Sequence, residues 1–171
     1  ELASLVPVVC FSPESHELVG GGAEVRRRFL DWIVFHVEPG FAEAHRRYGR
    51  VLRQRNALLK TMPDASELAA WTRELAEAGE AVAAFRARVY PDFASGMVRC
   101  LARVLDELGA AVLHYKRGWR EELSLLERLT MLQARELELG HSLAGPHRAD
   151  WSVEIGERTL RTEGSRGQQK L

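Results

Sequence analysis

A run of small and polar residues near the C-terminus has the composition of an anion-binding turn. It reads Gly164-Ser165-Arg166-Gly167-Gln168-Gln169-Lys170. Ser165 offers a hydroxyl, Gly167 lets the backbone approach a ligand, and a helix beginning at Ser165 would aim free N–H groups at a phosphate. Glu163 precedes Ser165 by two residues, so the run does not match the GxSxG nucleophile motif. An ordinary surface turn is the alternative interpretation.

A second group of candidate residues is basic. The span from 24 to 60 holds nine Lys or Arg residues against four Asp or Glu residues. Within the helix expected there, Arg46, Arg50 and Arg53 fall on one face, and Arg47 lies beside them. Such a row can follow a phosphate backbone and makes binding salt dependent. The alternative is a solvated helix face with local ion pairs.

Other chemistries find little support in the residue pattern. Cys10 and Cys100 are far apart and form no CxxC pair, which argues against a zinc ribbon or a redox dithiol. No two of the six histidines have metal-ligand spacing, so we predict no metal site. His147, Asp150 and Ser165 are the residue types of a hydrolase triad, but no oxyanion loop accompanies them.

The composition is that of an ordinary globular chain. Of 171 residues, 46% are apolar and 28% are charged, and the formal net charge is zero. No apolar run reaches the length of a transmembrane helix, so we expect a cytoplasmic protein. The chain begins at Glu1 rather than Met, and we expect it to be a piece of a longer protein.

Hydrophobic spacing predicts a mainly helical chain. Leu68, Trp71, Leu75, Ala78 and Val82 recur three and four residues apart, which is the most regular pattern in the sequence. Pro63-Asp64 is short enough to join two antiparallel helices, and Pro91 should kink the second helix without ending it. The expected elements are a strand at 5–11, a short helix from 12 to 20, helices at 24–37, 41–62 and 68–108, a strand at 111–115, a helix at 119–139, and strands at 151–155 and 158–161.

This order predicts a fold class that is mainly α (α+β). We expect an antiparallel long-helix hairpin, similar to a coiled coil, inserted into a small α/β remnant that ends in a β-hairpin. The two last strands are separated by Gly156-Glu157, which is the length of a hairpin turn.

Four segments, in this order, resemble the RecF family of ABC- and SMC-type ATPases. They read FSPESHELVGGGAEVRRRFLDWIVFHVEPGF, RRYGRVLRQRNALLK, GHSLAGPHRADW and GSRGQQKL, and the resemblance extends from Val6 to Leu171. One departure is Ala149, where RecF proteins usually carry a second acidic residue beside Asp150.

The resemblance implies a division of the chain and a role for its last residues. Residues 1–22 would be the end of an ATPase-lobe strand and a hinge, 23–108 the helical lever domain, and 109–171 a strand, helix, hairpin and ABC signature motif. That motif would be Ser165-Arg166-Gly167-Gln168, pressed on the γ-phosphate of ATP held with Mg²⁺ by the opposite subunit. Neither a Walker A nor a Walker B motif occurs in the sequence, so this chain alone should not hydrolyse ATP.

For the full-length protein, the resemblance implies a weak DNA-dependent ATPase that acts in DNA repair, recombination, replication restart and the SOS response. It would bind single-stranded and duplex DNA at gaps and junctions, dimerise on binding ATP, and help RecO and RecR load RecA. A rival interpretation remains from the residues alone, namely a stand-alone helical module that binds a protein partner and has no ATP-linked function.

Overall fold

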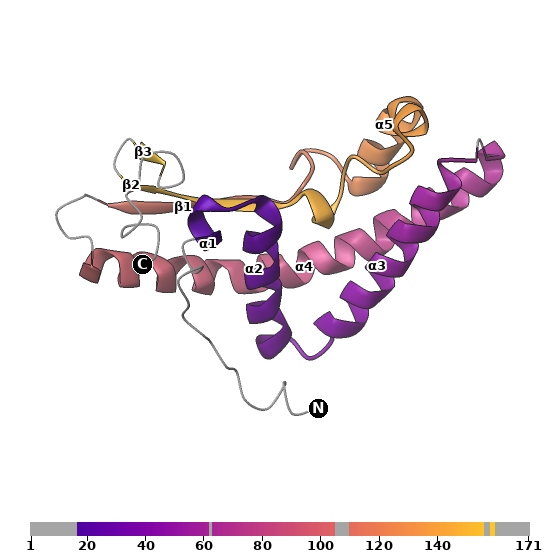
Figure 1. The fold of residues 1–171 in the computed structure, drawn as a ribbon. Helices are drawn as coiled ribbons and strands as arrows, with labels where there is room; N and C mark the ends of the chain where they lie inside the picture. Colours follow the sequence, from indigo (N-terminus) through magenta and orange to yellow (C-terminus); the bar gives the residue numbers. More distant parts are fainter. Residues whose placement is uncertain (1–16, 62, 105–109, 156–157, 160–171) are drawn as a thin grey trace. The chain divides into compact units, whose positions relative to one another are not determined.

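The computed structural model describes residues 17–61, 63–104, 110–155 and 158–159. The strand predicted at 5–11, the start of the short helix and the predicted motif at Ser165–Gln168 lie outside these residues. In chain order the elements are α1 (Glu17–Gly20), α2 (Ala23–Val37), α3 (Phe41–Leu58), α4 (Ala65–Val104), β1 (Ala111–Lys116), α5 (Leu125–Leu139), a 3₁₀ turn (Pro146–Arg148), β2 (Asp150–Ile155) and β3 (Arg158–Thr159) (Figure 1).

The chain divides into two compact units, each built from separated segments. One, here the sheet unit, takes its described residues from 1–37, 86–116 and 150–171. The other, the helical unit, consists of 38–85 and 117–149. Each unit groups residues that contact one another, even where they are far apart in the chain. The three predicted domains are consecutive stretches of sequence, so the two divisions cannot be compared directly and the predicted domains stay a prediction.

The sheet unit contains the three predicted strands that fall within the described residues. β1, β2 and β3 form one antiparallel sheet in that order, with Tyr115 opposite Trp151. Trp151 is buried, and its indole N–H donates to the backbone oxygen of Arg26 at 2.9 Å. Arg26, only 3% exposed, pairs with Asp150 at 2.7 Å. Helical spacing explains this burial, since Arg26 lies one turn before Leu30 and two turns before Val34 on the inner face of α2.

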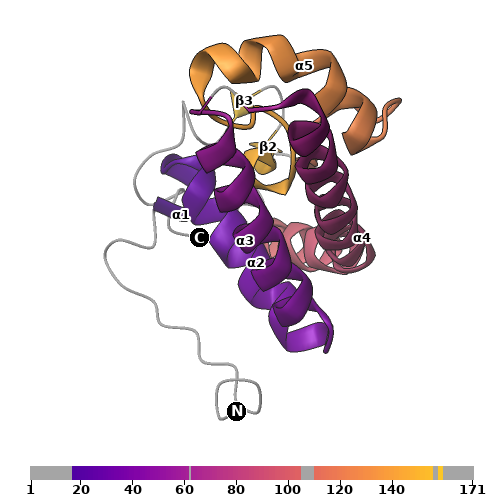
Figure 2. The ribbon, with the colours of Figure 1, turned by 90° about the vertical axis from the view of Figure 1, so that its right-hand side faces the viewer.

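The helical unit is built around an antiparallel hairpin of α3 and the first part of α4 (Figure 2), and it also contains α5. Three contacts fix the direction: Phe41 packs edge-on against Phe85, Tyr48 lies near Gly79, and Arg55 bonds to Thr72. Leu68, Leu75 and Val82 are fully buried on α4. This confirms the predicted hairpin and the mainly helical fold class.

Two of the helix boundaries that differ from the prediction have a clear local cause. α3 ends at Leu58 rather than 62, because the backbone N–H groups of Lys60 and Thr61 turn back to oxygens three residues earlier. α5 begins at Leu125 rather than 119. Ser124 and Glu127 form a reciprocal capping box there, and the preceding Trp119 donates its indole N–H to Leu123 in a loop.

α4 is 40 residues long and continues across Pro91 without ending there, as predicted. It does so although a proline removes one backbone hydrogen bond of the helix. No helix within the described residues is long and apolar enough to cross a membrane.

Candidate nucleic-acid interface on helix α3

Helix α3 presents opposite faces to the protein and to solvent. Phe41, Tyr48, Val51 and Arg55 are buried at spacings of three, four and seven residues, which makes one continuous inner face. The opposite side of the helix carries Arg46, Arg50 and Arg53, all exposed. The same 3.6-residue repeat that buries the first set therefore gathers the second set on one outer face, as the sequence predicted.

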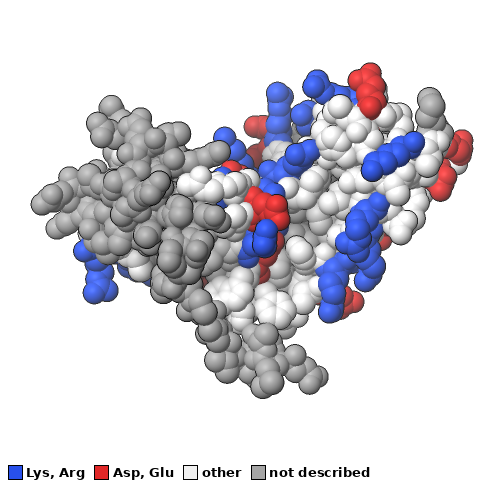
Figure 3. Space-filling model, in the orientation of Figure 1, with Lys and Arg blue, Asp and Glu red and all other residues white. Residues whose placement is uncertain are grey.

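The three outer arginines are open to a ligand. No hydrogen bond or ion pair to Arg46, Arg50 or Arg53 is present among the described residues. A run of Lys and Arg side chains follows α3 on the face shown in Figure 3. Because consecutive turns of a helix are about 5.4 Å apart, these arginines form a row of donors that suits a ligand with repeated negative charges.

Arg47 differs from its neighbours because two glutamates of α4 already hold it. Its guanidinium lies 2.6 Å from Glu74 and 3.1 Å from Glu77. Hydrogen bonds to Glu74 and then to Glu77 raise the pKa of Arg47 above its ordinary value. The predicted group of four thus separates into three arginines open to a ligand and one that ties α3 to α4.

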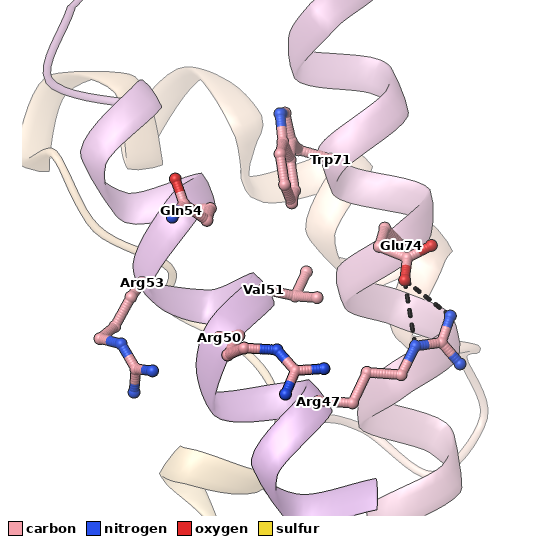
Figure 4. A pocket seen from close by; sticks show the side chains of 7 residues that line it. All are labelled: Arg47, Arg50, Val51, Arg53, Gln54, Trp71 and Glu74. Atoms are coloured by element: carbon pink, nitrogen blue, oxygen red, sulfur yellow. Dashed lines mark hydrogen bonds and ion pairs between the residues drawn. The ribbon is translucent and has the colours of Figure 1, made fainter.

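A hollow of about 580 Å³ lies between the two helices of the helical unit, and we call it the α3–α4 groove. Its lining residues are Arg47, Arg50, Val51, Arg53 and Gln54 of α3, and Trp71 and Glu74 of α4. Figure 4 shows Trp71 reaching between the two helices, and Arg50 extending from α3 toward the side of α4. Trp71 belongs to the apolar pattern noted in the sequence, but its place in a basic groove was not predicted.

A buried ion pair fixes the inner face of α3. Arg55 and Glu136 are both fully buried, and their nearest charged atoms are 2.7 Å apart. Arg55 also donates to Thr72 and Ser142, while Glu136 accepts from the backbone N–H of Leu143 at 2.7 Å. The pair joins α3, α4, α5 and the following loop.

Sequence reasoning missed this pair. The available signal was Arg55, which interrupts an otherwise apolar face of α3, because an arginine in that position needs a buried acid.

The GHSLAGPH part of the third resembling segment packs onto the same helix. Ser142 bonds through its backbone N–H and its hydroxyl to Asn56, each at 2.8 Å. His147 Nε2 lies 3.0 Å from the Ser142 carbonyl, which can only accept, so Nε2 donates there; in the neutral ring Nδ1 then accepts from the Tyr48 hydroxyl at 2.6 Å. These residues therefore position α3 from behind and leave its arginine face open.

The second predicted site, Ser165–Gln168, lies outside the described residues. Within the described part of the chain, no three His, Cys, Asp or Glu residues are grouped so that they could hold a metal ion.

Comparisons with known proteins point to one family. No family model matches the chain. The DNA replication and repair protein RecF of Stenotrophomonas maltophilia is 44% identical over 171 residues, covering 99% of this chain and 47% of the relative. RecF of Xanthomonas euvesicatoria is 43% identical with 99% and 46% coverage, and RecF of Coxiella burnetii is 38% identical with 99% and 47% coverage.

Solved structures agree with the sequence relatives. The structure of the recombination mediator protein RecF-ATPrS in the RecFOR pathway matches with a TM-score of 0.84 and 24% identity. The RecF-ATP structure from the same pathway matches with a TM-score of 0.83 and 25% identity. Each comparison covers 94% of this chain and 46% of the other. Over the span that aligns, the chain therefore belongs to the RecF family, and it covers about half the length of the curated relatives it matches.

Proposed function

We propose that the outer face of α3 is a DNA-binding surface of a RecF-like recombination mediator that acts in DNA repair. The observation that carries the proposal is the row formed by Arg46, Arg50 and Arg53, which are exposed and unpaired among the described residues. Guanidinium groups bind phosphates through strong charge-assisted hydrogen bonds. The buried Arg55–Glu136 pair holds the helix behind them in place.

Salt-dependent DNA binding tests this proposal. In the full-length protein, replacing Arg46, Arg50 and Arg53 by Ala should weaken binding to both single-stranded and duplex DNA. The slope of log K against log salt should fall by about 0.7 to 0.9 for each phosphate that an arginine no longer neutralises. Fluorescence anisotropy over a range of salt concentrations measures both quantities.

The matched control is Arg73→Ala. Arg73 is exposed on α4 and does not line the groove, so the variant removes the same kind of charge from another face. Equal effects per arginine in the triple variant and the control would mean that the α3 row has no special role, and the proposal would then be wrong.

The proposal for the whole protein includes an ATP-linked cycle. Ser165–Gln168 is proposed as the signature motif that contacts the γ-phosphate of ATP bound with Mg²⁺ by the opposite subunit, which stabilises a homodimer. The resemblance at GSRGQQKL and the RecF-ATP relative support it. The full-length protein would be a weak DNA-dependent ATPase of the cytoplasm and would work with RecO and RecR to load RecA.

Dimerisation of the full-length protein tests the signature motif. Ser165→Arg places a long cation where the γ-phosphate approaches, so ATP should still bind to the monomer while ATP-dependent dimerisation is abolished. Light scattering with and without ATP measures this, and an unchanged dimer would refute the role of Ser165. A protein that neither dimerises with ATP nor binds DNA would instead favour the stand-alone interaction module.

A further inference from the structure

Trp71 is the member of the apolar α4 pattern that the fold leaves partly open. Leu68, Leu75, Ala78 and Val82 of the same pattern are at most 1% exposed. Trp71, by contrast, is only partly buried and lines the α3–α4 groove. A tryptophan is large and often keeps part of its ring exposed, and the open part of Trp71 faces the groove rather than an outer surface of the helix.

Trp71 also has no hydrogen-bonding or ring-stacking partner among the described residues. Trp119 and Trp151 donate their indole N–H groups to backbone oxygens. No described residue accepts a hydrogen bond from Trp71, and no ring or guanidinium within the described ranges stacks on it. The exposed part of its ring and its N–H donor therefore remain available to a ligand in the groove.

The residues around Trp71 define the chemistry of that ligand. Arg50 and Arg53 supply positive charge that no described acid neutralises, and the exposed Gln54 supplies an amide that can both donate and accept. The lining acid, Glu74, is occupied by Arg47. A volume of about 580 Å³ falls within the range of small-molecule sites. A flat apolar group attached to a negatively charged backbone matches all of these features.

We propose that the α3–α4 groove binds one unpaired nucleobase of a single-stranded nucleic acid, stacked on Trp71 with its flanking phosphates on Arg50 and Arg53. This deepens the proposed function, since it rests on the arginine row as a DNA-binding surface. Stacking on aromatic side chains binds single strands because an unpaired base exposes its π-face. In a duplex each base face is covered by its neighbours, so a duplex would contact only the arginines.

The test compares three nucleic acids with the full-length protein. The probes are a short oligothymidylate, an abasic oligonucleotide of equal length, and a duplex. Trp71→Ala should weaken binding of the oligothymidylate by about tenfold. Its affinity for the abasic strand and the duplex should change less than twofold, because these probes offer no base to stack. Trp71→Phe keeps an aromatic ring and should retain most of the oligothymidylate affinity.

A fluorescence measurement keeps the proposal falsifiable if Trp71→Ala does not fold. Oligothymidylate should quench the tryptophan emission of the wild-type protein. In Trp71→Phe this quenching should disappear while binding, followed by anisotropy, persists. Quenching that is the same in the wild type and Trp71→Phe would overturn the proposal, because the quenched tryptophan would then be another one.

The outcomes separate this inference from the proposed function. If Trp71→Ala leaves oligothymidylate binding intact while the triple arginine variant abolishes it, the DNA-binding surface stands and the stacking site is wrong. An equal decrease for all three probes would assign Trp71 a structural role and also overturn the inference. Tighter binding of a glutamate-rich peptide carrying one aromatic residue, in competition with oligothymidylate, would identify the groove as a protein-docking site instead.

Discussion

Adjacent arginines on α3 have different roles because of what α4 places opposite them. Arg46 is open to solvent, whereas Arg47, one position along, is held by Glu74 and Glu77. At an exposed surface such ion pairs contribute little to stability. Their larger effect is on ligand binding, since a phosphate must compete with two carboxylates for Arg47.

Releasing Arg47 should therefore strengthen DNA binding. Glu74→Gln removes the closer of the two carboxylates, so a phosphate then competes with Glu77 alone for Arg47, and affinity should rise roughly fivefold at low salt. The increase should vanish at high salt. Anisotropy titrations measure this, with Glu67→Gln as the control, because Glu67 is an exposed acid of α4 that does not line the groove. Weaker binding of Glu74→Gln would contradict the competition.

The outer arginines could be predicted from sequence because helical spacing alone fixes a face. The buried pair could not be predicted, since Arg55 and Glu136 come together only when α5 packs on α3. Arg26 is an intermediate case: helical spacing puts it on the same face of α2 as Leu30 and Val34, but its partner Asp150 comes from a distant strand. The local spacing of residues therefore predicted which side chains share a helix face. Which acid pairs with a buried arginine depends on tertiary packing and could not be predicted from that spacing.

At Gly79, α4 lies close to three neighbouring segments of the helical unit. A Cβ atom there would clash with Leu125, whose side chain is fully buried, and would lie 3.3 Å from atoms of both Pro146 and Tyr48. Glycine is ordinarily unfavourable in the middle of a helix. Its presence here allows the start of α5 and the 3₁₀ turn to approach α4.

Alanine scanning of two glycines in the same helix should give opposite signs. Gly79→Ala should lower the free energy of unfolding by about 1 to 3 kcal/mol, because the overpacked methyl group outweighs the gain in helix propensity. Gly96→Ala has open space around its Cβ, with only the end of Arg99 at 3.8 Å, and should raise that free energy by about 0.5 to 1 kcal/mol. Urea unfolding measures both; a stabilising Gly79→Ala would contradict the close approach.

The start of α5 is an element that the sequence could have located better. Apolar residues continue from Trp119 into the helix and favour an early start, but Ser124 and Glu127 have the spacing of a capping box. The structure uses that box. The end of the helix at Gly140, by contrast, follows directly from the left-handed backbone that glycine adopts there.

At the scale of the whole molecule, the link between Asp150 and Arg26 makes stability depend on pH. Burial alone would raise the pKa of Asp150, but the hydrogen bond and the charge of Arg26 outweigh it and hold that pKa below its ordinary value. A carboxylate with a lowered pKa stabilises the folded state above its unfolded pKa of about 3.9. That contribution disappears as pH falls through the folded pKa.

Asp150→Asn should therefore destabilise the protein at neutral pH and much less in acid. The difference in unfolding free energy between the wild type and Asp150→Asn should be constant above about pH 5 and should shrink as pH falls below about 4. Denaturant unfolding across this range measures it. The exposed Asp92→Asn of α4 is the control, and a difference that grows in acid would contradict the assigned pKa direction.

The two units are nested in the chain, and this has a consequence for folding kinetics. β1 and β2 pair along their whole length, but the residues between them, 117–149, belong to the helical unit. Before that segment is folded, joining the two strands means closing a long flexible loop, which carries an entropic cost. Once α5 has formed against α3, the loop is shorter and stiffer. The helical unit should therefore acquire protected amides first, and the sheet should be the late, rate-limiting structure.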